Sequence, residues 1–170
     1  MKLRVKGKPY NISKAIVGIV TSNPNDCDES KILISDEFES TSYFAAYLSQ
    51  NKELKTKITK NAIVYNLPYI DHLSEGDIVA ISSDGNISTL YRSKANANFL
   101  LLTERCNSNC LMCSQPPKNR NDINYLTEIN KQVISLMPKN LRELGLTGGE
   151  PTLLGEHFFD LMNHIMLELP

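Results

Sequence analysis

Phe99-Leu100-Leu101-Leu102-Thr103 is a near-continuous apolar run, and the cysteine-rich segment Cys106-Asn107-Ser108-Asn109-Cys110-Leu111-Met112-Cys113 follows it closely. Such a run is typical of a strand that is buried on both faces of a parallel sheet. The segment after the run brings three thiols into one short loop. The sequence therefore predicts a buried strand with a cysteine loop at its carboxyl end.

The three thiols of this loop, Cys106, Cys110 and Cys113, have no fourth ligand close by in the sequence. The next histidine is His157, and the only other cysteine is Cys27. A structural zinc site takes four protein ligands, and a fully thiolate-bound iron–sulfur cluster takes four cysteines. Three thiols alone indicate a metal centre with one open position. The alternative is a non-catalytic zinc or iron–sulfur module in which Cys27 or a histidine completes the ligand shell.

A strand and helix pattern continues after the cysteine loop. Residues 124–137 and 157–169 carry apolar side chains at helical spacing, and residues 141–147 have the pattern of a second strand. Alternating strands and helices generate parallel strands. The second strand ends in Gly148-Gly149-Glu150-Pro151, which taken alone indicates only a turn.

The cysteine spacing and the Gly148–Pro151 segment, each placed after an apolar strand, together resemble the radical S-adenosylmethionine (radical SAM) enzymes. The resemblance implies a [4Fe-4S] cluster that binds S-adenosylmethionine at its fourth iron. The cluster ligands would be Cys106, Cys110 and Cys113. The residues implied to contact the cofactor are Gly148, Gly149, Glu150 and Pro151 at the methionine moiety, and Met112 in the place of an aromatic residue that packs on the adenine.

The activity implied by the resemblance is radical chemistry. One electron from the reduced cluster would cleave S-adenosylmethionine into methionine and a 5'-deoxyadenosyl radical, which abstracts a hydrogen atom from the substrate. The amino-acid sequence of residues 100–107 and 111–117 is most similar to that of the maturases of the His-Xaa-Ser system, which act on a small peptide or protein. Implied partners are such a substrate and an electron donor such as flavodoxin or ferredoxin.

The fold class expected from the resemblance is α/β, the start of a radical SAM (β/α)6 partial barrel preceded by a small β-rich domain. Residues 96–170 would form the first two β/α units. Because two parallel strands cannot cover both faces of a sheet, we expect a truncated chain with an exposed sheet edge and low stability. An inactive fragment that retains only a binding role is the corresponding alternative.

Residues 1–95 are expected to form the small β-rich N-terminal domain. Short β-branched runs predict strands near residues 14–20, 31–34 and 61–67, and Asp84-Gly85 predicts a two-residue hairpin turn. Apolar spacing predicts a helix over residues 36–50. The domain is either a packing appendage or a module that presents a peptide to the catalytic part.

Composition limits the possible environments and partners. The 170 residues are 41% hydrophobic and carry 18 Lys and Arg against 19 Asp and Glu, a net charge of -1. This balance gives no general attraction for nucleic acid or acidic membranes. There is no signal-peptide pattern and no long apolar segment, so we expect a soluble, cytoplasmic protein. In such a reducing compartment clustered cysteines are metal ligands, and Cys27 is expected to be a free surface thiol.

Overall fold

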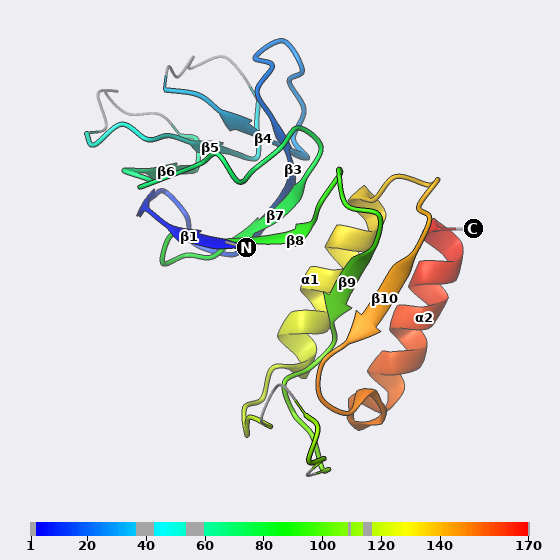
Figure 1. The fold of residues 1–170 in the computed structure, drawn as a ribbon. Coiled ribbons are helices and arrows are strands. Elements are labelled where there is room, and N and C mark those ends of the chain that lie inside the picture. The colour runs from blue at the N-terminus through cyan, green and yellow to red at the C-terminus, as the bar shows by residue number, and fades with distance from the viewer. Residues whose placement is uncertain (1–2, 37–42, 54–59, 109, 114–116, 170) are drawn as a thin grey trace. The chain divides into compact units, whose positions relative to one another are not determined.

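The computed structural model describes residues 3–36, 43–53, 60–108, 110–113 and 117–169. The chain divides into two compact units, Met1–Lys94 and Ala95–Pro170. The first unit holds a mixed sheet of eight strands, and the second holds two parallel strands with two α-helices (Figure 1). Each unit contains buried hydrophobic residues.

The sheet of the first unit has the strand order β1-β8-β7-β3-β4-β5-β6-β2. Strands β3, β4, β5 and β6 run parallel to one another, whereas the remaining neighbouring pairs of the sheet are antiparallel. The strands are β1 (Arg4–Lys6), β2 (Lys8–Tyr10), β3 (Ile16–Thr21), β4 (Lys31–Ile34), β5 (Ala46–Leu48), β6 (Ile63–Tyr65), β7 (Ile78–Ile81) and β8 (Asn86–Tyr91).

The two outermost strands of this order, β1 and β2, are separated in the chain by Gly7 alone. One continuous segment therefore pairs with β8 through its first half and with β6 through its second half, so the sheet closes on itself. A side chain at Gly7 would meet the Tyr65 carbonyl oxygen at 2.6 Å. Closure removes the open edges that would otherwise pair with another chain.

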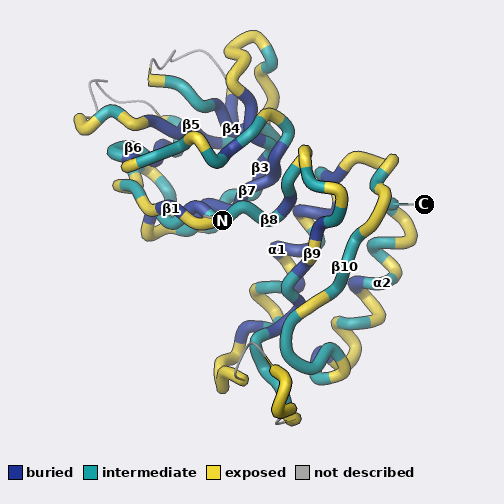
Figure 2. Tube along the Cα trace, in the orientation of Figure 1, coloured by how far each residue is buried: buried dark blue, intermediate teal, exposed yellow. Residues whose placement is uncertain are grey.

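Burial in the first unit is concentrated on the strands, as Figure 2 shows for β3, β4 and β7. The main cluster contains Val20, Ile32, Leu48, Val64 and Val79, which are 0% exposed. A second buried cluster is formed by Leu33, Phe44, Tyr47 and Ile63. Because neighbours in one strand, such as Ile32 and Leu33, enter different clusters, β4 to β6 are buried on both faces.

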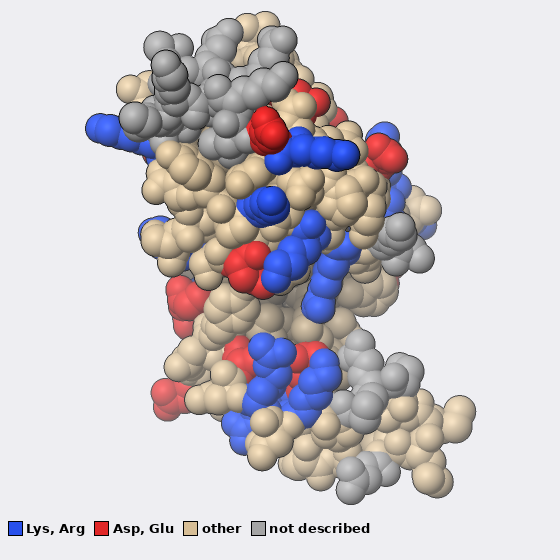
Figure 3. All heavy atoms as spheres, turned by 90° about the vertical axis from the view of Figure 1, so that its left-hand side faces the viewer, with Lys and Arg blue, Asp and Glu red and all other residues tan. Residues whose placement is uncertain are grey.

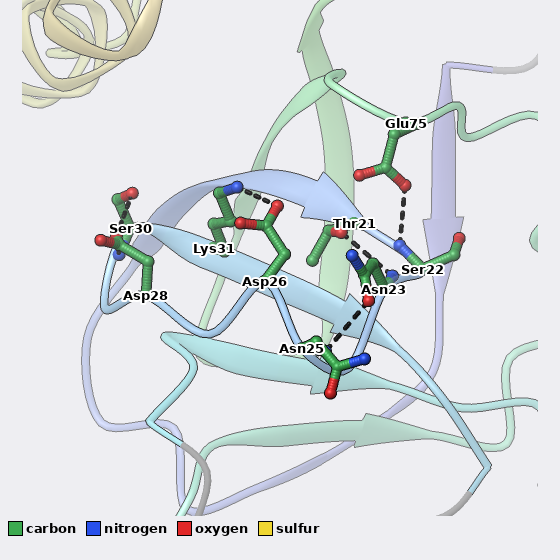
Figure 4. Close-up of polar contacts among 9 residues, drawn as sticks. All are labelled: Thr21, Ser22, Asn23, Asn25, Asp26, Asp28, Ser30, Lys31 and Glu75. Atoms are coloured by element: carbon green, nitrogen blue, oxygen red, sulfur yellow. Dashed lines mark hydrogen bonds and ion pairs between the residues drawn. The ribbon is translucent and has the colours of Figure 1, made fainter.

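The connection from β3 to β4 is a polar loop held by short-range hydrogen bonds (Figure 4). The backbone N–H groups of Asn23, Asn25 and Ser30 each donate to a side chain two residues earlier, at 3.1, 3.0 and 2.7 Å. Such local bonds favour turns over regular structure. At the end of β3, the Ser22 N–H donates to the Glu75 carboxylate at 2.8 Å, which ties the loop to the segment before β7.

The hairpin predicted at Asp84-Gly85 is confirmed, since β7 and β8 are antiparallel neighbours on either side of it. Its turn differs from the two-residue type: Gly85 N–H donates to the Ser82 carbonyl at 3.0 Å, and among residues 82–86 only Gly85 has a positive φ, +82°. A type I turn followed by one left-handed residue fits this pattern. The Asp84 carboxylate holds the turn by accepting from Ser82 and from Lys6 at 2.5 and 3.0 Å.

The helix predicted over residues 36–50 is wrong where the structure describes that range, and residues 37–42 lie outside the described residues. The segment contains β5, whose three residues are all buried. Tyr47 and Leu48 belong to this strand and enter different buried clusters, and Phe44, which precedes it, is buried with Tyr47. A strand of this kind is apolar at successive positions, so its pattern imitates one face of a helix.

The second unit consists of β9 (Asn98–Leu101), α1 (Ile123–Leu136), β10 (Leu144–Thr147), the short 3₁₀ helix η1 (Pro151–Leu154) and α2 (Glu156–Glu168). The two strands are parallel, with Leu100 opposite Leu146. Helices α1 and α2 pack together, with Lys131 on α1 paired to Asp160 at 2.5 Å. Lys139, which follows α1, pairs with Glu168 at 2.8 Å. His164 on α2 lies 3.0 Å from the Ser135 hydroxyl.

The fold class expected from the sequence, an α/β chain that starts a radical SAM (β/α)6 partial barrel, is wrong. The described residues form mainly the mixed eight-stranded sheet, together with one separate strand pair and two α-helices. The expectation relied on the strand and helix alternation after residue 98, which in the structure produces a single parallel pair. Most strands lie before Lys94 and pair with distant partners, which local periodicity does not reveal.

Charged side chains of both signs lie near one another at several places on the face drawn in Figure 3. Lys6 and Asp84 form an ion pair whose side chains are 60% and 52% exposed. Exposed pairs of this kind contribute little to stability. In the part of the chain that the structure describes, neither helix has the length and apolar character needed to cross a membrane.

Candidate functional site

The two motif segments meet at the start of the cysteine loop. The parallel pairing of β9 and β10 continues beyond the strands: Leu102 N–H donates to the Thr147 carbonyl at 2.9 Å, and Gly149 N–H donates to the Thr103 carbonyl at 2.8 Å. Glu150 N–H then donates to the Arg105 carbonyl at 2.9 Å. Gly149 and Glu150 are therefore hydrogen-bonded to Thr103 and Arg105, two of the three residues that precede Cys106. We call residues 103–105 the loop root.

The two glycines allow this close backbone approach. A Cβ built on Gly149 would lie 1.8 Å from the Arg105 carbonyl oxygen and 3.2 Å from the Cys106 nitrogen. Gly148 has a φ of +134°, and its Cβ would lie 2.4 Å from the Thr103 carbonyl oxygen. Only glycine fits at these positions without displacing backbone atoms. In the structure the two glycines thus pack the Gly148–Glu150 segment against the loop root.

Asp122, the residue immediately before α1, holds the loop root from another direction. Its side chain is 4% exposed and accepts hydrogen bonds from the Thr103 hydroxyl at 2.8 Å and from Glu104 N–H at 2.9 Å. The Thr103 hydroxyl oxygen in turn accepts from Arg105 N–H at 3.0 Å. Thr103, Glu104 and Arg105 are each bonded through this carboxylate or through the hydroxyl next to it.

Glu104 connects the loop root to the segment that follows the cysteines. Its carboxylate accepts from Lys118 at 2.5 Å and from Arg120 at 2.9 Å, and its carbonyl accepts from Lys118 N–H at 3.0 Å. Hydrogen bonding to the Lys118 ammonium is the main cause that lowers the pKa of Glu104. These contacts join the two ends of the cysteine loop, although both cations are largely exposed and water weakens the pairs.

The three loop cysteines differ in exposure. Cys106 is partly buried, and its sulfur accepts from Ser108 N–H at 3.4 Å, whereas Cys110 and Cys113 are exposed. Cys113 N–H donates to the Cys110 carbonyl at 3.1 Å, so a tight turn separates these two residues. No disulfide forms between cysteines in the described residues, which include all four of them. Asn109 and residues 114–116 lie outside the described part.

The described side chains do not converge on a metal ion. Among them, no group of three or more His, Cys, Asp or Glu has the geometry of a metal site. The chemistry of the donor set nevertheless fits an iron–sulfur cluster, because the loop offers three thiols, which are soft ligands suited to iron. Exposure of Cys110 and Cys113 leaves their sulfurs accessible, and binding would require the thiols to turn toward one centre.

Glu150 caps the short helix η1. Its Oε1 accepts from Thr152 N–H at 3.0 Å and from the Thr152 hydroxyl at 2.7 Å, and Pro151 begins the helix. The bond from the Thr152 backbone, followed by that from its hydroxyl, lowers the pKa of Glu150. The carboxylate is therefore ionised near neutral pH. Among the hydrogen bonds within the described part, its Oε2 accepts none, so this oxygen is available to a cation.

The other residues considered for the site take no part in the hydrogen bonds given above for the loop root and Glu150 among the described residues. Met112 is 96% exposed at the tip of the cysteine loop. Cys27 belongs to the first unit, is exposed as expected, and its sulfur accepts from Tyr43 N–H at 3.0 Å. His157 and His164 are on α2, and neither belongs to a group that would hold a metal among the described residues.

Sequence reasoning missed Asp122 and Thr103. A signal for Asp122 was present, because an aspartate directly before an apolar helical pattern is a common helix-start residue. That signal would have predicted a cap for α1, whereas the carboxylate makes no cap hydrogen bond and points to the loop root. Thr103 is the last residue of an apolar run, and nothing local distinguishes its hydroxyl from that of other strand threonines.

Comparison of the chain with known proteins adds no relative to these observations. No family model matches the sequence, and no curated protein is similar enough to be reported as related.

Proposed function

We propose that the second unit is an iron–sulfur and S-adenosylmethionine site that supports radical chemistry on a peptide or small protein. The observation that carries the proposal is the hydrogen-bonded contact between the Gly148–Glu150 segment and the loop root, with Glu150 N–H 2.9 Å from the Arg105 carbonyl oxygen. The contact brings the glycine segment and Glu150 to the start of a loop that carries three thiols. An iron–sulfur cluster bound by the thiols and an ammonium group bound by Glu150 would have to lie side by side, which requires the two segments to be neighbours.

The chain's own residues would have distinct roles in this site. Cys106, Cys110 and Cys113 would supply the thiolates, and when bound the cluster would supply the electron for reductive cleavage of S-adenosylmethionine. Glu150 would accept a hydrogen bond from the ammonium of the methionine moiety, since a charge-assisted bond is about twice as strong as a neutral one. Met112 would place a polarisable thioether near the adenine.

The proposed substrate is a peptide or small protein, and the proposed electron source is a protein such as flavodoxin or ferredoxin. Support for this part comes from the sequence resemblance around residues 100–117. Incubation of the reconstituted chain with a His-Xaa-Ser repeat peptide, S-adenosylmethionine and a reductant tests it. A change in peptide mass that needs all three would support the assignment, and turnover of free small molecules alone would contradict it.

Electron paramagnetic resonance of the anaerobically reconstituted, reduced chain tests the cofactor site. We expect a [4Fe-4S] signal that changes when S-adenosylmethionine is added. The matched control is adenosine, which lacks the amino and carboxylate groups that would bind the open iron and should leave the signal unchanged. Bound zinc without acid-labile sulfide would favour a structural metal module instead, and a cluster signal that ignores the cofactor would contradict the proposed open iron.

A further inference from the structure

The Asp122 carboxylate accepts hydrogen bonds from the loop root and does not cap its own helix, α1. A residue at this position usually caps the first N–H groups of the helix, and Ser, Thr, Asn or Asp can all do so. Asp122 makes no such bond. Its two oxygens accept from the Thr103 hydroxyl and from Glu104 N–H, at 2.8 and 2.9 Å. The side chain therefore fixes the loop more directly than it fixes α1.

Burial raises the free-energy cost of breaking the hydrogen bonds between Asp122 and the loop root. Asp122 is 4% exposed, and Thr103 beside it is 0% exposed. A buried carboxylate is costly unless it is hydrogen-bonded, and a bond to a charged group contributes more than a neutral one. Loss of either partner would leave a buried polar group unsatisfied. Departures of the loop root from its present geometry are thus penalised strongly.

The loop root is in turn the partner of the Gly148–Glu150 segment. Thr103 and Arg105 offer their carbonyl oxygens to Gly149 and Glu150 at 2.8 and 2.9 Å, while Arg105 N–H is held by the Thr103 hydroxyl at 3.0 Å. A chain of hydrogen bonds therefore runs from Asp122 through the loop root to Glu150. The residue that precedes Cys106 takes part in this chain on both its N–H and its C=O.

We propose that Asp122 is a positioning residue that sets the distance between the first loop cysteine and the Gly148–Glu150 segment. It acts through Thr103 and touches neither the thiols nor the carboxylate of Glu150. The inference rests on the proposed function for the identity of the group that would bind between them. Its structural part, the fixing of Gly149 and Glu150 through the loop root, is independent of any bound group.

Amide hydrogen exchange of the 170-residue chain without cofactors tests the structural part. In Asp122→Ala we expect the Gly149 and Glu150 amides to exchange at least about tenfold faster than in the unchanged chain. Asp122→Asn should accelerate them less than Asp122→Ala, because its amide oxygen can still accept from Glu104 N–H, although the Thr103 hydroxyl loses its acceptor. Thr103→Val, which keeps the side-chain shape, should act like Asp122→Ala, and it serves if the alanine variant does not fold.

Asn130→Ala is the matched control. Asn130 is also on α1, is 4% exposed, and donates to the Leu101 carbonyl at 2.9 Å, two residues before the loop root. Its loss should lower the melting temperature about as much as the loss of Asp122 and should spare the Gly149 and Glu150 amides. Equal acceleration of these amides in Asn130→Ala and Asp122→Ala would overturn the positioning role, and so would an Asp122→Asn variant that behaves like the alanine variant.

A second measurement separates this inference from the proposed function. In the reconstituted chain, we expect Asp122→Ala to raise about tenfold the S-adenosylmethionine concentration that gives half of the spectral change. Asn130→Ala should leave this concentration unchanged. If the unchanged chain itself shows no response to S-adenosylmethionine, the proposed function fails. The amide exchange result still decides whether Asp122 positions the loop root.

Discussion

Gly149 lies against Arg105 so closely that a Cβ on Gly149 would be 1.8 Å from the Arg105 carbonyl oxygen. The next residue, Glu150, donates its N–H to that same oxygen at 2.9 Å. A side chain at position 149 would therefore separate the two segments that form the candidate site. Sequence alone suggested that the glycines serve a ligand, whereas the structure assigns them first to the contact between the two motifs.

Gly149→Ala is expected to destabilise the second unit by about 1–3 kcal/mol, because the methyl group meets backbone atoms that cannot rotate away. Urea unfolding measures the loss. Gly155→Ala is the control: Gly155 has a φ of +57° and open space around it, so alanine there adds strain of about 1 kcal/mol without a clash. Equal losses in the two variants would contradict the close approach of Gly149 to Arg105.

Serine substitution of each loop cysteine should abolish cluster uptake. Cys106→Ser, Cys110→Ser and Cys113→Ser replace a soft thiolate by a hard, poorly ionised hydroxyl, so we expect loss of most iron and acid-labile sulfide after reconstitution. Cys27→Ser, which alters an exposed cysteine of the first unit, should leave both contents unchanged. Iron and sulfide analysis measures the effect. A chain that loses its sulfide only on change of Cys27 would contradict the loop assignment.

The hairpin of the first unit should carry an acid-sensitive contact. Hydrogen bonds from the Ser82 hydroxyl and then from Lys6 lower the pKa of Asp84 from 3.8 to about 2. A depressed pKa means that this stabilisation is fully present above pH 3.8 and is lost as the pH falls toward 2. NMR titration of the Asp84 carboxyl carbon measures the midpoint. Ser82→Ala should raise it more than Lys6→Met, and a midpoint near 3.8 in the unchanged chain would contradict the contacts.

Local sequence signals were sufficient for the elements of the second unit. The apolar run at residues 99–103 and the helical spacing of residues 124–137 correspond to β9 and α1, within a few residues at each end. The predicted second strand and second helix correspond to β10 and α2. Each of these elements is amphipathic or uniformly apolar over its own length, so its type can be inferred without knowledge of its neighbours.

The first unit was less predictable because its organisation depends on distant pairs. Segment 4–10 contains two lysines, a glycine and a proline, yet it closes the sheet by pairing with β8 and β6. Residues 46–48 form a strand only because both sides of it are covered by other strands' side chains. No local sequence pattern predicts the pairing of segment 4–10 or the strand at residues 46–48. The contact between Gly149 and Arg105 was equally hidden, although the motif itself was visible.

Glu150→Gln should weaken cofactor binding without weakening the fold. The glutamine oxygen can still accept from Thr152 N–H, as Glu150 Oε1 does at 3.0 Å, so η1 keeps its cap. The negative charge that the cofactor ammonium would meet is lost, and a charge-assisted bond contributes about 1.5–3 kcal/mol, so we expect S-adenosylmethionine affinity to fall about tenfold or more. Spectral titration of the reconstituted chain measures it. Glu156→Gln, an exposed acid in the first turn of α2, is the control and should change nothing. An unaltered affinity in Glu150→Gln would show that the carboxylate serves only as a helix cap, because that role is the one the substitution preserves.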